Sequence, residues 1–211
     1  MNRSSERLLI EGDAGAIETE LDYPGIDQPR GVALVAHPHP LYGGALENKV
    51  AQTLAWTLRD LGYVALRPNF RGVGQSAGVH DKGIGETDDL QRVATWASER
   101  FGNESTVLAG FSFGSYVQVR LAQRIAVERM ILVGTAVGRV SGDREYAAAH
   151  VPNDTIVIHG ELDDTVPLAN VLAWAAPQDL PVVVIPGADH FFHRRLHIIR
   201  GIVKRAWPSL P

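Results

Sequence analysis

Side chains of the types used in nucleophilic hydrolysis occur along the chain in the order Ser112, Asp163 and His190. A serine hydroxyl is a weak nucleophile unless a base removes its proton, and an imidazole base needs a carboxylate to fix its tautomer. Ser112 is the centre of Gly110-Phe-Ser-Phe-Gly114. This sequence matches the G-x-S-x-G pattern, in which a sharp strand-to-helix turn exposes the serine. The three residues predict acyl transfer to water through an acyl-enzyme.

Each of these residues also has a plainer structural interpretation. Ser112 could cap the helix that follows a glycine-rich turn, and Asp163 could cap a turn or a helix. His190 could be an ordinary loop histidine. Asp164 is the alternative acid, but Asp163 lies nearer the end of the preceding apolar run.

The elements that would position these residues are short apolar runs separated by amphipathic stretches. The runs are continuous rather than alternating, as expected for strands that are covered on both faces. The expected strands are 31–36, 63–66, 106–109, 129–133, 155–158 and 181–185.

The stretches between the runs carry apolar residues at three- and four-residue steps, which is typical of helices packed on a sheet. Before residue 31, two segments around residues 8–10 and 17–23 are separated by a glycine-containing turn and indicate an antiparallel hairpin at a sheet edge. We therefore expect an α/β fold whose mostly parallel sheet has about eight strands and helices on both faces. The apolar residues that mark the expected helices lie within 50–61, 90–101, 117–125, 171–175 and 192–203, with Asp88 and Asp89 at the start of the second helix and Pro167 leading into the fourth.

This arrangement predicts where the three candidate residues lie. Ser112 follows the strand at 106–109, Asp163 follows the strand at 155–158, and His190 follows the last strand. All three then lie at the carboxyl ends of parallel strands, the edge at which open α/β sheets place their sites.

Composition excludes several other classes of protein. The 211 residues are 45% hydrophobic and 21% charged, which is typical of a globular chain, and the length fits a single domain over 1–211. The net charge of −4 and the lack of a basic stripe argue against nucleic-acid and membrane partners. The absence of cysteine excludes disulfides and a cysteine nucleophile. With neither a signal-peptide core nor a membrane-spanning run, we expect a cytoplasmic location.

As a set, the motifs resemble the α/β-hydrolase superfamily over nearly the whole chain. Two further segments make the chain similar to small bacterial hydrolases related to dienelactone hydrolase, an enzyme that itself uses a cysteine nucleophile. The resemblance implies a serine esterase-type fold that needs no cofactor and no metal. The segments that carry it are Gly110–Gly114, Gly160-Glu-Leu-Asp163-Asp-Thr-Val-Pro167, Asp189-His190, His37-Pro-His-Pro-Leu-Tyr-Gly-Gly44 with Asn48–Val50, and Asn69-Phe-Arg-Gly-Val-Gly-Gln-Ser76.

The resemblance also bears on access to the site. Members of this superfamily commonly insert a lid after the sixth strand, but here only residues 134–154 separate that strand from the next. The segment is too short for a lid domain, so we expect no cap domain and an open, shallow site.

The expected oxyanion hole departs from the pattern of many relatives. They carry His-Gly-Gly after the third strand, whereas His39 of this chain lies between two prolines that have no N–H to donate. We expect the backbone N–H groups of Phe113 and His39 to bind the oxyanion. The backbone N–H groups of Leu41 and Tyr42 are the alternatives to that of His39.

The candidate substrate-binding residues are Tyr42 and Arg71. Arg71 could bind a substrate carboxylate, although an arginine in such a loop more often braces backbone carbonyls. The same loop matches G-x-G-x-x-A at residues 72–77, but no helical pattern starts there, so no nucleotide cofactor is expected.

The expected substrate is a small-molecule carboxylic ester or thioester of small or medium size. A metal-dependent hydrolase using His37, His39, His190 and His193 is an alternative, although no H-E-x-x-H pattern occurs. We expect His193, together with His197, to be a surface or packing residue on the last helix. A noncatalytic ligand-binding protein on a hydrolase fold is the third possibility.

Overall fold

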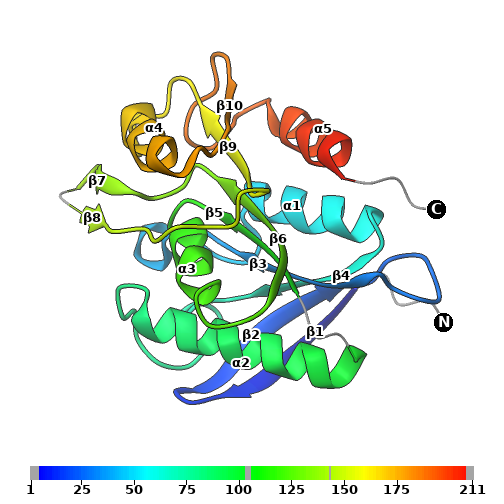
Figure 1. The fold of residues 1–211 in the computed structure, drawn as a ribbon. Coiled ribbons are helices and arrows are strands. Elements are labelled where there is room, and N and C mark those ends of the chain that lie inside the picture. The colour runs from blue at the N-terminus through cyan, green and yellow to red at the C-terminus, as the bar shows by residue number, and fades with distance from the viewer. Residues whose placement is uncertain (1–4, 103–105, 143, 208–211) are drawn as a thin grey trace.

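The computed structural model describes residues 5–102, 106–142 and 144–207, which are built around an eight-stranded sheet (Figure 1). The first strand pairs antiparallel with the second, the second pairs antiparallel with the strand Tyr63–Pro68, and all the remaining pairs of this sheet are parallel. The expected N-terminal hairpin and mostly parallel sheet are therefore confirmed. In spatial order the strands are β1 (Ser5–Gly12), β2 (Gly15–Asp22), β4 (Tyr63–Pro68), β3 (Gly31–Ala36), β5 (Thr106–Phe111), β6 (Val127–Val133), β9 (Ile156–Gly160) and β10 (Val182–Ile185).

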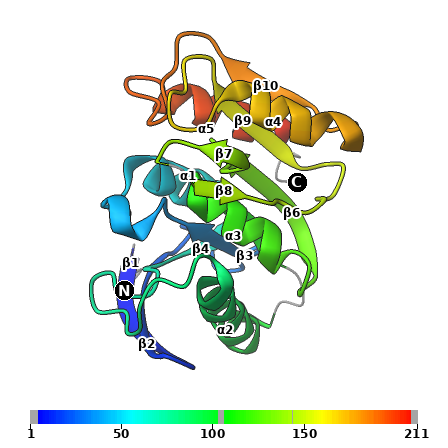
Figure 2. The same ribbon diagram turned by 90° about the vertical axis from the view of Figure 1, so that its left-hand side faces the viewer.

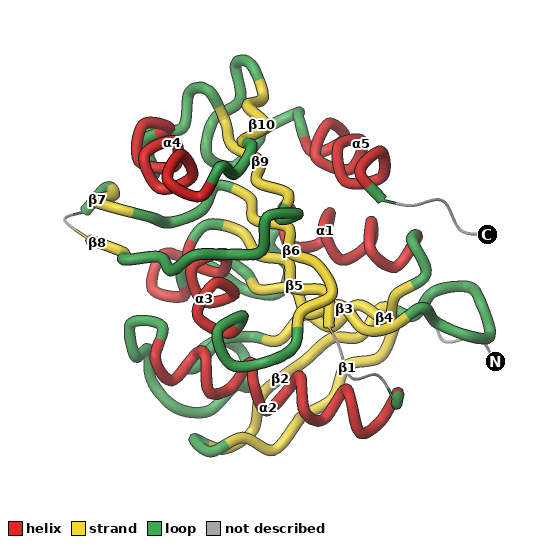
Figure 3. The backbone as a smooth tube through the Cα atoms, in the orientation of Figure 1, coloured by secondary structure: helices red, strands yellow, loops and turns green. Residues whose placement is uncertain are grey.

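Helices cover both faces of the sheet, as Figure 3 shows with red helices on either side of the yellow strands. One face carries α1 (Lys49–Asp60) and α5 (Leu196–Ala206), whose buried residues share one apolar cluster. The other face carries α2 (Ile84–Phe101), α3 (Phe113–Leu121) and α4 (Leu168–Ala175), which pack in a second cluster. The sheet therefore separates two cores.

The central strand β3 shows why continuous apolar runs form such a sheet. Successive side chains of a strand point to opposite faces. Val32, Leu34 and Ala36 enter the cluster with α2, α3 and α4. The alternate residues Ala33 and Val35 enter the cluster with α1 and α5. Both faces of this strand are buried, so it has no polar side.

A short antiparallel hairpin, β7 (Gly138–Val140) and β8 (Arg144–Tyr146), lies between β6 and β9. No element is expected there from the sequence. In Figure 2 the hairpin lies beside α3, and the Tyr146 ring contacts that of Tyr116 on α3 at a centroid distance of 4.9 Å. The hairpin is far smaller than a lid domain, so the expected absence of a cap is confirmed.

The expected start of the last helix and the expected end of the third helix are wrong. The last helix begins at Leu196 rather than Phe192, because Phe192 and Arg194 have positive φ angles of 54° and 60°. His193 therefore lies in a turn before α5, not on the helix. The third helix ends at Leu121, and Ile125 lies beyond it in a turn.

A search of the described residues for a helix long and apolar enough to cross a bilayer finds none.

Candidate active site

Ser112 occupies a strained turn between β5 and α3. Its φ of 56° and ψ of −122° lie outside the regions that non-glycine residues favour. The flanking glycines allow this turn to pack closely. A Cβ on Gly110 would lie 2.6 Å from the Ser115 nitrogen, and a Cβ on Gly114 would overlap the carbonyl oxygens of residues 36 and 37. The G-x-S-x-G pattern thus has a steric reason at both glycines.

Hydrogen bonds to β6 hold this turn in place. The Ser112 N–H donates to the Val133 carbonyl at 2.9 Å. The Ser115 hydroxyl donates to the same carbonyl at 3.1 Å and accepts from the Val133 N–H at 3.2 Å. The position of Ser112 is therefore set by two neighbouring strands.

The structure brings Ser112, His190 and Asp163 together. His190 Nε2 lies 3.0 Å from Ser112 Oγ, and His190 Nδ1 lies 2.7 Å from Asp163 Oδ2. An ionised carboxylate only accepts hydrogen bonds, so Nδ1 carries the ring proton and Nε2 is free to accept the serine proton. All three residues are buried.

The Asp163 carboxylate is fixed by its own loop. Oδ1 accepts from the N–H groups of Thr165 at 3.0 Å and Val166 at 2.7 Å, which leaves Oδ2 for His190. His159 Nε2 donates to the Val166 carbonyl at 3.0 Å and lies 3.4 Å from Asp163 Oδ2. Burial lowers the pKa of His159, which favours its neutral form.

Asp164, the alternative acid, is exposed. Its Oδ1 accepts from the hydroxyl of Thr165 at 3.3 Å. The structure thus places Asp163, and not Asp164, against His190.

The two residues whose N–H groups are the candidate oxyanion donors have neighbouring side chains. Phe113 is the first residue of α3, where backbone N–H groups have no partner within the helix. Neither its N–H nor that of His39 donates to another group in the part of the chain that is described. The rings of the two residues contact each other at a centroid distance of 4.7 Å. By contrast, the N–H groups of Leu41 and Tyr42 donate to His39 Nδ1 at 3.3 Å and to the His39 carbonyl at 3.1 Å.

A buried histidine supports the loop that carries His39. His37 Nδ1 donates to the Pro38 carbonyl at 2.7 Å, and its Nε2 accepts from the Phe70 N–H at 2.9 Å. Complete burial lowers the pKa of His37 to about 3, so the ring is neutral and can make both bonds. The sequence motif contained His37 but did not reveal this role.

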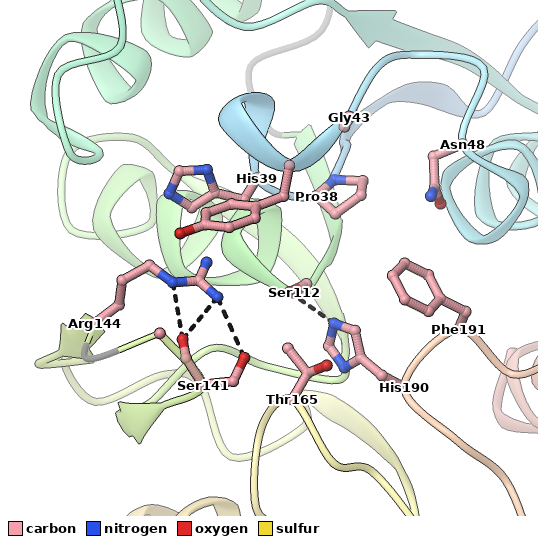
Figure 4. A pocket seen from close by; sticks show the side chains of 13 residues that line it. Pro38, His39, Gly43, Asn48, Ser112, Ser141, Arg144, Thr165, His190 and Phe191 are labelled. Carbon is pink, nitrogen blue, oxygen red and sulfur yellow. Dashed lines mark hydrogen bonds between the residues drawn. The ribbon is translucent and has the colours of Figure 1, made fainter.

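A cavity of about 300 Å³ opens beside Ser112 (Figure 4). The loop of residues 38–44 borders it, together with the β7–β8 hairpin and the loop of His190 and Phe191. Tyr42, one of the candidate substrate-binding residues, lines this cavity and is 65% exposed.

Arg71, the other candidate substrate-binding residue, does not line this cavity. Its Nε and Nη2 bind the two carboxylate oxygens of Asp89 at 2.7 and 3.0 Å, which ties the loop to α2.

Arg144 on β8 lines the cavity instead, although it is not among the residues expected there from the sequence. Its Nε and Nη2 donate to the Ser141 carbonyl at 3.1 and 2.9 Å. The guanidinium carbon lies 4.2 Å from the centre of the Tyr42 ring, within the range of a cation–π contact. The only sequence signal was a charged residue in the segment after the sixth strand.

The histidines considered for metal binding are used otherwise. His37 has both ring nitrogens in hydrogen bonds, and His190 contacts Ser112 and Asp163. His193 is exposed and pairs with Asp189 at 2.6 Å. His197 is exposed on α5. Across the described ranges, no three His, Asp or Glu side chains form a group that could hold a metal ion.

Comparisons with known proteins identify the family and the fold of the chain. The family model described as X-Pro dipeptidyl-peptidase (S15 family) matches residues 15–150. An uncharacterized protein of Rickettsia prowazekii is 33% identical over 196 residues, which cover 88% of this chain and 82% of that protein.

Solved structures are similar over nearly the full length. An α/β serine hydrolase without a lid from Xanthomonas campestris is 35% identical, with a TM-score of 0.89 over 100% of this chain and 99% of that chain. An α/β serine hydrolase homologue from Coxiella burnetii is 36% identical, with a TM-score of 0.83 over 96% and 97% of the two chains. The chain therefore belongs to the X-Pro dipeptidyl-peptidase (S15) family and is a lidless α/β serine hydrolase.

Proposed function

We propose that the protein hydrolyses a small or medium carboxylic ester or thioester through an acyl-enzyme. The observation that carries this proposal is the continuous hydrogen-bonded chain from Ser112 through His190 to Asp163, beside an open cavity. This arrangement supplies a nucleophile, a base and a group that orients the base.

In the first half of the reaction, Ser112 Oγ forms a bond to the substrate carbonyl carbon while its proton passes to His190 Nε2. The carbonyl oxygen becomes an oxyanion, which the N–H groups of Phe113 and His39 stabilise. When the intermediate collapses, the bond to the leaving oxygen or sulfur breaks, and His190 returns the proton to the leaving group. Asp163 stabilises the imidazolium that forms between these steps.

In the second half, water replaces the leaving group. His190 removes a proton from the water as its oxygen attacks the acyl carbon, and a second oxyanion forms. Collapse of this intermediate releases the carboxylic acid and returns the proton to Ser112 Oγ. The open cavity lets water reach the acyl-enzyme without the movement of a lid.

The family description raises cleavage of a peptide after an Xaa-Pro unit as a second candidate. Such a substrate presents a free amino group, which a carboxylate of the enzyme would bind. The described lining of the catalytic cavity contains no Asp or Glu and instead includes the cation Arg144. This charge pattern favours the ester or thioester.

The decisive experiment is labelling with a fluorophosphonate probe, which reacts with an activated serine. We expect labelling of the wild type and of Ser141→Ala, which lacks another hydroxyl of the cavity, and no labelling of Ser112→Ala. Unchanged labelling of Ser112→Ala would rule out the proposed nucleophile.

Substrate class is tested with nitrophenyl esters, acyl thioesters and an Xaa-Pro nitroanilide. We expect ester or thioester hydrolysis that depends on Ser112 and is insensitive to a chelator. Faster cleavage of the nitroanilide would favour the peptidase, and loss of activity with chelator would favour a metal-dependent mechanism. Probe labelling without turnover of any substrate would favour the noncatalytic alternative.

A further inference from the structure

One cationic side chain lies in the described lining of the catalytic cavity. Among the described residues that line it, Arg144 is the sole permanently charged group. His39 also lines the cavity, but burial lowers its pKa to about 4, so its ring is neutral at neutral pH. A substrate in this cavity therefore meets a positive charge that no carboxylate among the described lining residues balances.

Arg144 is oriented by contacts with a backbone carbonyl and aromatic side chains, none of which neutralises its charge. Ser141 holds Nε and Nη2 through its carbonyl, and the ring of Tyr42 lies against the guanidinium. The Tyr146 hydroxyl also interacts with this guanidinium, and within the described ranges no carboxylate lies within ion-pair distance of Arg144. The planar fork of an arginine is suited to binding a carboxylate. Arg144 is therefore a pre-oriented hydrogen-bond donor for an anion, and its side chain is half-buried at the edge of the cavity.

The position of Arg144 relative to His190 shows which part of a substrate it would meet. His190 must return its proton to the leaving group, so the leaving group lies on the side of His190 and Phe191. Figure 4 shows Arg144 on the other side of Ser112, extending from the hairpin toward it. This side of Ser112 is where the acyl chain would lie.

A second cavity of about 450 Å³ continues beyond Arg144 and shares that residue with the catalytic cavity. The rings of Tyr116 and Tyr146 form part of its wall, and the exposed Lys82 and Glu145 stand at its border. An acyl chain that reaches Arg144 therefore lies beside this second cavity, which could hold a longer acyl chain.

Resting on the proposed hydrolase function, we infer that the acyl part of the natural substrate carries a carboxylate that Arg144 binds. The substrate class is then the monoester or monothioester of a dicarboxylic acid. Membership of the S15 family does not by itself imply a preference for such substrates. The preference would come from Arg144 on the β7–β8 hairpin of this chain.

The test compares the 4-nitrophenyl monoesters of glutaric and adipic acid with the same compounds in which the free acid is capped as a methyl ester. Spontaneous hydrolysis is subtracted for each compound. For the wild type, we expect kcat/KM for at least one free acid to exceed that of its capped partner about tenfold or more, because a charge-assisted bidentate contact is formed. In Arg144→Gln we expect this ratio to fall to about one, while hydrolysis of the capped ester continues.

Two variants separate the role of Arg144 from a general effect of charge or folding. Arg124→Gln removes the same charge from an exposed arginine that pairs with Asp88 outside the cavity, and it should keep the wild-type ratio. Arg144→Lys keeps the charge but loses the fork that Ser141 holds, so an intermediate ratio is expected. The rate with the capped ester reports whether the site is intact in each variant.

Several outcomes would overturn the inference. A wild type that hydrolyses capped and free esters equally, or an unchanged ratio in Arg144→Gln, would show that Arg144 does not select the acid. Butyryl-coenzyme A is compared with its neutral truncated thioester, butyryl-N-acetylcysteamine. An Arg144-dependent preference in this pair alone would place the anion on the leaving group instead. Failure to hydrolyse any ester or thioester would refute the proposed function itself, which is a distinguishable result.

Discussion

Asp163 and His190 are 27 residues apart in the chain, yet Asp163 Oδ2 and His190 Nδ1 lie 2.7 Å apart. The other carboxylate oxygen of Asp163 is held by two backbone N–H groups of the same loop. The contact with His190 is therefore directional, because the carboxylate cannot rotate without breaking those bonds.

We expect Asp163→Asn to lower kcat by up to about ten-thousandfold with a much smaller change in stability, because an amide can favour the wrong tautomer of His190. The matched control is Asp164→Asn, which changes the adjacent exposed carboxylate and should keep kcat within about threefold of the wild type. Steady-state kinetics with one nitrophenyl ester, together with urea unfolding, measure both effects. Equal losses of kcat in the two variants would contradict the role of Asp163.

The backbone N–H of His39 can be removed by proline substitution. His39 has a φ of −57°, close to the angle that proline requires, so His39→Pro removes the donor with little conformational change. Its control, His39→Ala, loses the ring but keeps the N–H. We expect kcat of His39→Pro to be about a hundredfold or more below that of His39→Ala. Similar kcat values in the two variants would exclude this N–H from the oxyanion hole.

Gly114 should tolerate no side chain. A Cβ at this position would overlap the carbonyl oxygens of Ala36 and His37, which are backbone atoms that cannot move alone. Gly114→Ala should lower the free energy of unfolding by about 1 to 3 kcal/mol or more. Gly25→Ala, where a Cβ meets nothing within 4 Å, should change it by less than about 0.5 kcal/mol. Urea denaturation of both variants compares the two positions directly.

Burial of His37 predicts a loss of stability in acid. Its pKa is lowered from 6.5 to about 3 in the folded protein. The unfolded chain therefore takes up a proton first as the pH falls, and the stability present above about pH 6.5 is lost progressively toward pH 3. At about pH 4.5 this group alone should cost about 2 to 3 kcal/mol, since each pKa unit corresponds to about 1.4 kcal/mol.

The variant His37→Gln tests this prediction, because its side-chain oxygen can still accept from the Phe70 N–H. Although less stable at neutral pH, it should lose about 2 to 3 kcal/mol less than the wild type between pH 7 and about pH 4.5. His197→Gln, at an exposed histidine of α5, should follow the wild type. If the unfolding free energies of wild type and His37→Gln fall in parallel with pH, burial of His37 is not the cause.

The sequence by itself determined the strands of the eight-stranded sheet, the order along the chain of Ser112, Asp163 and His190, and the edge of the sheet at which they meet. A strand buried on both faces must be apolar at every position, so continuous runs such as Val32–Val35 carry a strong signal. Parallel strands place their carboxyl ends together, so the chain order was enough to predict that the three residues converge.

The start of the last helix and the hairpin at residues 138–146 were decided only in the tertiary structure. Phe192 and Arg194 take positive φ angles although they lie within a helix-like apolar pattern. The periodicity therefore placed the start of the last helix too early in the chain. The strands β7 and β8 have three residues each, too few to show a period. Contacts such as that between Tyr146 and Tyr116 instead hold this segment in place.

Tertiary packing also determines which arginine lines the cavity. From the sequence, Arg71 was the candidate for binding a substrate carboxylate, but it pairs with Asp89 of α2. Arg144 reaches the cavity because the hairpin packs against α3 and Ser141 orients its side chain. Local sequence gives each arginine the same charge and reach. Only long-range packing determines which one meets a carboxylate of the protein and which one faces the cavity.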